Sequence, residues 1–108
     1  MKILIYTILL ITLLKQTTVH AHQGHNEISS DNAINIASKS LKKLTFKDLG
    51  YGVGKLETSW KSLNDSNFNV LEVLETTLII SATNSLNDQV IYFEITKSGK
   101  VLSVKYTY

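Results

Sequence analysis

The sequence lacks cysteine, proline and arginine altogether. Without cysteine the chain can form no disulfide framework and offers no site for lipoprotein lipidation. The lack of proline excludes a proline-rich linker. The 11 basic residues are all lysines and face 9 acidic residues, and Lys2 and Lys15 lie in the first 21 residues, so the rest of the chain is formally neutral. Nucleic acid binding requires clustered Lys and Arg to displace counterions, and we therefore exclude it.

The first 21 residues have the pattern of a secretory signal peptide. Lys2 supplies a positive start, and an aliphatic run extends from Ile3 to Leu14. Signal peptidase recognises small or branched residues just before its cleavage site, and the chain has them in Val19-His20-Ala21. This predicts cleavage after Ala21. A spanning helix needs about 20 apolar residues, more than this run provides. We expect a periplasmic or secreted protein with no stable membrane span after cleavage; an uncleaved anchor is the alternative.

All three histidines lie between residues 20 and 25, on both sides of this cleavage site. Cleavage would make His22 the first residue, so its α-amine and imidazole could chelate one metal ion. His25 could add a third nitrogen and Glu27 a carboxylate oxygen. Such a donor set suits Cu(II), Zn(II) or Ni(II). The alternative is that residues 22–27 form a flexible, solvated tail in which the histidines are incidental.

The domain that follows, residues 28–108, begins with a predicted helix. Ser29 or Ser30 can accept hydrogen bonds from the first-turn amides. Apolar residues then recur at three- and four-residue steps on one helical face, namely Ile34, Ala37, Leu41 and Leu44. Phe46 and Leu49 could extend this face by a further turn. The glycines at 50, 52 and 54 disfavour continuation of the helix. We interpret them as a flexible connection, because a phosphate-binding loop would follow a strand and these glycines follow a predicted helix.

The rest of the domain has the alternation of β-strands. Leu56, Thr58 and Trp60 alternate with polar residues, which predicts a strand over 55–61. Residues 68–74 fit a helix or a strand, and the β-forming run 76–80 directly after them favours a strand. Runs at 90–95 and 101–106 flank the glycine-containing segment 97–100, the pattern of a hairpin.

The predicted fold class is therefore α+β, with one N-terminal helix packed on a four-stranded antiparallel meander. We expect Ile34, Leu41, Trp60 and Ile91 to share one core between helix and sheet.

No catalytic residues are predicted. The domain after residue 27 contains no histidine to act as a base for a serine nucleophile, and there is no cysteine nucleophile. Glu72 and Glu75 are best explained as solvated residues. We therefore expect a protein that is not an enzyme.

The chain resembles the small PepSY-type domains of exported bacterial proteins. It is more closely similar to an uncharacterised family of short periplasmic proteins whose mature chains open Ala-His-Gly-x-His. The matching segments are Ala21-His22-Gln23-Gly24-His25, Ile28-Ser29, Gly54-Lys55-Leu56-Glu57-Thr58-Ser59-Trp60 and residues 92–107. The chain departs from the pattern at Gln23, which is inserted, at Ser98, which replaces an aspartate, and at Tyr108, where glycine is expected.

Two functions are consistent with these patterns. The first is an exported accessory protein that binds a transition metal through His22, His25 and Glu27. The second is a PepSY-like module that binds or inhibits an exported protein partner through its sheet, without metal.

Overall fold

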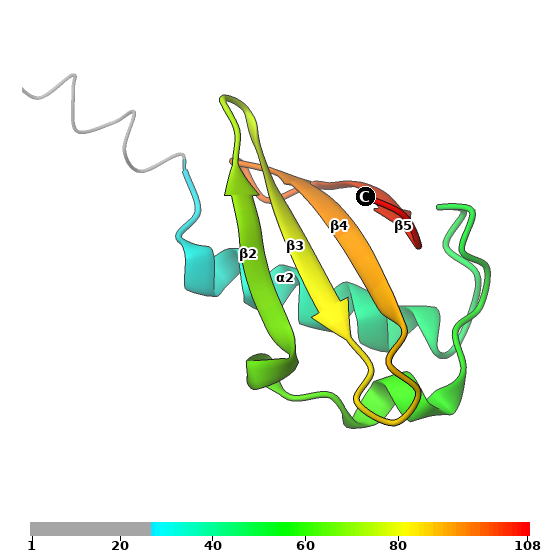
Figure 1. The fold of residues 1–108 in the computed structure, drawn as a ribbon. Coiled ribbons are helices and arrows are strands. Elements are labelled where there is room, and N and C mark those ends of the chain that lie inside the picture. Colours follow the sequence, from blue (N-terminus) through cyan, green and yellow to red (C-terminus); the bar gives the residue numbers. More distant parts are fainter. Residues whose placement is uncertain (1–26) are drawn as a thin grey trace, which may run out of the picture.

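The computed structural model describes residues 27–108 and confirms the predicted fold class. Helix α2 (Ser30–Leu44) packs against one face of a four-stranded antiparallel sheet (Figure 1). The strands are β2 (Phe68–Val73), β3 (Thr77–Thr83), β4 (Val90–Thr96) and β5 (Val101–Lys105), and they lie in chain order as a meander. Two short 3-10 helices, η2 (Thr58–Ser62) and η3 (Asp65–Asn67), precede the sheet.

Helix α2 begins and ends where its sequence favours. The Ser29 hydroxyl accepts a hydrogen bond from the Asn32 N–H at 3.1 Å, as an N-cap should. Lys42 and Lys43 lie in the last turn, where their charge suits the negative end of the helix dipole. The face buried against the sheet carries Ala33, Ala37, Leu41 and Leu44.

The predicted extension of this apolar face beyond Leu44 is wrong. The helix ends there, and the side chain of Phe46 is 67% exposed. Its ring instead lies under the ammonium group of Lys61, 4.2 Å from the ring centroid, as in a cation–π contact. Of the four predicted core residues, Leu41, Trp60 and Ile91 are buried in one cluster, and Ile34 is partly buried against it.

The predicted strand over residues 55–61 is also wrong, because η2 begins within this segment at Thr58. The buried residues of the segment are Leu56 and Trp60, the next buried residue is Leu63, and Thr58 is exposed. That spacing suits a tight helical turn rather than a strand. The backbone N–H of Leu56 donates to the carbonyl of Leu44, which holds the segment against the end of α2.

The sheet still has four strands without residues 55–61. Residues 68–80 contain all of β2 and the first part of β3. The favoured strand at 68–74 is confirmed as β2, and a turn at residues 74–76 leads into β3. The predicted 97–100 hairpin joins β4 to β5. Gly99 has a φ of 102°, and a Cβ there would come within 3.4 Å of the Ile36 side chain. The positive φ of this turn therefore favours glycine, and a larger side chain would pack directly against Ile36.

The side chain of Asn84 fastens the β3–β4 loop to η2. It is fully buried, its Nδ2 donates to the Ser59 hydroxyl at 3.0 Å, and its Oδ1 accepts from the Leu86 N–H at 3.0 Å. We expect Asn84→Ala to lower the free energy of unfolding by about 1–3 kcal/mol, because it removes two hydrogen bonds made by a fully buried side chain. Urea denaturation measures the change.

Asn87→Ala is the matched control, since Asn87 lies in the same loop but is exposed and bonds only to Gln89. It should change stability by less than about 0.5 kcal/mol. Equal effects of the two substitutions would contradict the role assigned to Asn84.

Candidate functional site

Two of the three predicted metal ligands, His22 and His25, lie outside the described residues. Glu27 is described and exposed, three residues before α2. The neighbouring Ile28 N–H donates to the carbonyl of Lys97 at 2.8 Å, which fixes the start of the domain to the β4–β5 turn. Within residues 27–108, no group of three or more His, Cys, Asp or Glu side chains is placed to hold a metal ion.

A second candidate site lies on the face of the sheet that points away from α2, here called the outer face. On β4, Ile91, Phe93 and Ile95 face the helix, so Tyr92 and Glu94 lie on the outer face. The strand register places Glu72, Ile79, Glu94 and Ser103 in one row across the four strands. The outer face therefore carries two carboxylates on either side of an apolar residue.

The centre of this face is covered, although no helix of residues 27–108 packs on it. Ile79 is only 8% exposed, and its outer-face neighbours Thr77 and Ser81 are also buried. The Thr77 hydroxyl donates to the Glu94 carboxylate at 3.2 Å. All of the β3 residues except the last are consequently buried on both faces, which is unusual for a two-layer domain whose second face meets solvent.

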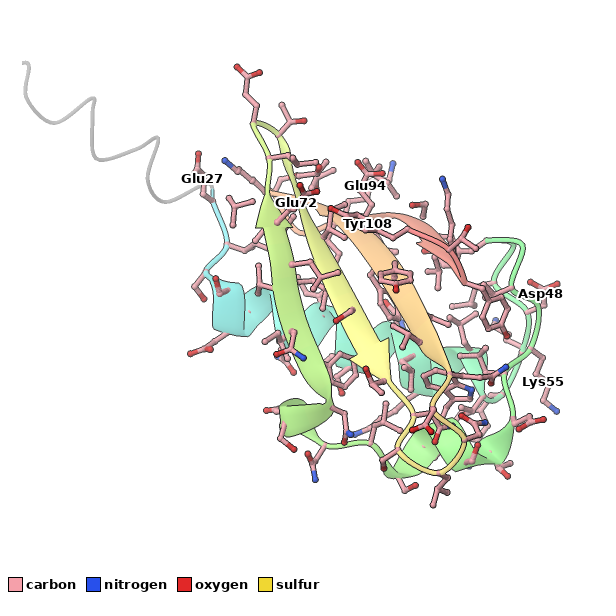
Figure 2. All side chains as sticks on the ribbon, viewed as in Figure 1. Glu27, Asp48, Lys55, Glu72, Glu94 and Tyr108 are labelled. Atoms are coloured by element: carbon pink, nitrogen blue, oxygen red, sulfur yellow. The ribbon has the colours of Figure 1, made fainter. Side chains whose placement is uncertain are left out.

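The chain after β5 turns back over this face and ends at Tyr108. The Tyr108 ring stacks on Tyr92, with ring centroids 5.4 Å apart and planes inclined by 22°. Its hydroxyl donates to the carboxylate of Glu72. Because Tyr92 belongs to β4 and Glu72 to β2, Tyr108 spans the sheet above β3. Figure 2 shows Glu72, Glu94 and Tyr108 close to one another on this side of the sheet.

A hollow of about 280 Å³ adjoins the Tyr108 ring. It combines an apolar floor with a carboxylate, an ammonium group and hydroxyls. Its lining residues are Ile79, Tyr92, Phe93, Glu94, Ser103, Lys105, Thr107 and Tyr108. Such a mixture of apolar surface and a few polar groups is typical of ligand and peptide sites.

Sequence reasoning missed this site. Tyr108 was noted as a departure from the family pattern, and Glu72 was interpreted as a solvated residue. The outward positions of β4 carried the available signal, since Tyr92 and Glu94 alternate with three buried residues. What the pattern could not show is that Tyr108 reaches back to β2.

One edge of the sheet is also apolar. Strand β2 pairs only with β3 within the described part of the chain, and three large apolar residues at its end are exposed, namely Leu71, Val73 and Leu74. A bulge between Val70 and Glu72 interrupts the ladder there. Among residues 27–108, no helix is long and apolar enough to cross a membrane.

Comparison with known proteins gives one match. The model of a family of unknown function, DUF6488, matches residues 1–108, and the chain therefore belongs to this family. No curated protein and no solved structure matches the chain.

Proposed function

We propose that this member of DUF6488 is a small exported accessory protein, not an enzyme, that binds a divalent transition metal through its N-terminal histidines. The observation that carries the proposal is the position of His22 and His25, directly after a predicted signal cleavage site. Copper, zinc and nickel are the candidate ions, with Cu(II) favoured by the general order of affinities.

Glu27, the one predicted donor that the structure describes, is exposed. Within residues 27–108, the Ile28 N–H donates the hydrogen bond that joins the start of the domain to the β4–β5 turn. The other two predicted donors, His22 and His25, precede this junction in the sequence. A metal held there would be accessible to a partner that delivers or removes it.

The proposal requires that His22 become the first residue. We expect the exported protein to have the mass of residues 22–108, because Val19-His20-Ala21 follows the apolar run. Intact-mass spectrometry of protein purified from the exported fraction measures this. A mass that still includes residues 1–21, or a start at another residue, would remove the chelating amine from His22.

Titration of the mature protein with copper and zinc tests the metal itself. We expect Cu(II) to bind with 1:1 stoichiometry, since the tail offers one set of nitrogen donors. Binding should weaken as the pH falls below about 7, because protons compete for the amine and the imidazoles. Isothermal titration calorimetry at two pH values measures both properties.

The alternative function is a PepSY-like module that binds or inhibits an exported protein without metal. The exposed Leu71, Val73 and Leu74 at the β2 edge favour it, because an apolar edge strand can pair with a partner. The two functions differ in the copper titration. A mature protein that binds neither copper, zinc nor nickel would leave the interaction module as the function.

A further inference from the structure

The outer face of the sheet carries groups from three strands, and the Tyr108 side chain covers part of it. Glu72 and Tyr92 belong to β2 and β4, and β3 between them contributes the buried Ile79. These groups are fixed by the strand register. Tyr108, by contrast, follows the last residue of β5 by three positions and belongs to no strand. The sheet thus supplies the surface, and Tyr108 reaches it on a segment outside the strands.

Tyr108 is held by few contacts. Its side chain is 67% exposed, and its specific partners are the Tyr92 ring and the Glu72 carboxylate. The hollow beside it, lined in part by Glu94 and Lys105, offers a further carboxylate and an ammonium group. A partner segment that placed an aromatic ring in the same two contacts could make further contacts in this hollow through its neighbouring residues.

We propose that the outer face binds a tyrosine presented on an extended segment of a partner protein, and that Tyr108 occupies this site in the free protein. The chemistry of the occupant is defined by what Tyr108 contacts. Stacking on Tyr92 requires a flat aromatic ring, and the Glu72 carboxylate requires a hydrogen-bond donor at the far side of that ring. A phenol satisfies both requirements. This site is independent of the N-terminal metal donors and goes beyond either function above.

Occupation of the outer face by Tyr108 lowers the apparent affinity of this face for an added peptide. A site that is free for only a tenth of the time binds a competitor about ten-fold more weakly than a site that is always free. Removal of the Tyr108 ring should therefore strengthen binding of an added peptide. A higher affinity for the peptide would indicate that Tyr108 and the peptide compete for the same site. A substitution that merely damaged the surface would lower the affinity instead.

The experiment uses the full mature chain and a blocked peptide, acetyl-Val-Lys-Tyr-Thr-Tyr-amide, which reproduces residues 104–108. Wild type and Tyr108→Ala are titrated in parallel and followed by ¹H–¹⁵N NMR. We expect the peptide to bind Tyr108→Ala about ten-fold more tightly than wild type. The shifted amides should include those of Ile79, Tyr92 and Glu94. A peptide whose last tyrosine is replaced by alanine should not bind.

Tyr106→Ala is the matched control, because Tyr106 is exposed and does not line the hollow. It should bind the peptide as wild type does. Adding Glu72→Gln to Tyr108→Ala should weaken binding, since the neutral amide is a poorer acceptor for the phenol. Thermal melts of each variant verify that the domain is folded.

Three results would overturn the proposal. The first is equal affinity of wild type and Tyr108→Ala, and the second is shifted amides confined to the β2 edge or to α2. The third is a concentration-dependent dimer of wild type that Tyr108→Ala abolishes, which would assign the outer face to a second copy of this chain. Titrations performed without metal and with excess chelator keep the outcome separate from that of the copper experiments.

Discussion

Replacing Trp60 with alanine should lower the free energy of unfolding by about 2–5 kcal/mol. The indole is 1% exposed and belongs to the cluster in which α2, η2 and the sheet meet. Truncation would leave a cavity that the neighbouring Leu41 and Leu56 cannot fill without moving. A domain of this size has a total stability of about 5–15 kcal/mol, so the loss would be a large part of it. Urea denaturation followed by far-ultraviolet circular dichroism measures the change.

Phe46→Ala is the matched control for the loss of an aromatic ring. Phe46 lies 67% exposed at the end of α2, and its ring contacts the ammonium group of Lys61. Its removal should cost less than about 1 kcal/mol, the magnitude of an exposed cation–π contact. A change below about half a kcal/mol for Trp60→Ala, or equal changes for both variants, would show that η2 does not pack as described.

These two aromatic residues also show how far the sequence predicts the fold. The burial of Trp60 was predicted correctly from its size and its place in an alternating pattern, although the strand assigned to it was wrong. Period-two alternation over 55–61 depended on counting Thr58 as an inward residue, and Thr58 is exposed. Phe46 fits the apolar face of α2 by spacing, but the helix ends at Leu44 before that face can continue. Local patterns therefore predicted which residues are buried better than how the backbone reaches them.

The sheet was predicted more reliably because its signals are local. In β4, Ile91, Phe93 and Ile95 alternate with outward residues, and Gly99 supplies the positive φ of the following turn. The outer-face site depends instead on a contact between Tyr108 and Glu72, which are 36 positions apart. Neither residue has a neighbour in sequence that indicates the other. A site made by the return of a chain end over a sheet leaves no periodicity to read.

Replacing His22 with alanine should reduce the affinity of the mature protein for Cu(II) at least about ten-fold. The α-amine and the imidazole of His22 would act as one chelate, in which binding of the first donor holds the second donor beside the metal ion. Loss of the imidazole removes this advantage. Acetylation of the α-amine should have a similar effect, because it removes the other donor of the same chelate. His25→Ala should weaken binding less, since it leaves the chelate intact. Calorimetric titration of each protein with copper measures the affinities.

Glu75→Gln is the control within the domain, because Glu75 is an exposed carboxylate in the β2–β3 turn. It should bind copper as the unsubstituted mature protein does. Copper should also leave the melting temperature almost unchanged, because a chelate within the tail binds the folded and unfolded chains alike. A closed site in the domain would instead raise the melting temperature as copper is added. Equal affinity of the acetylated and free proteins would exclude the N-terminal chelate, and a melting temperature that rises with copper would place the metal in the folded domain.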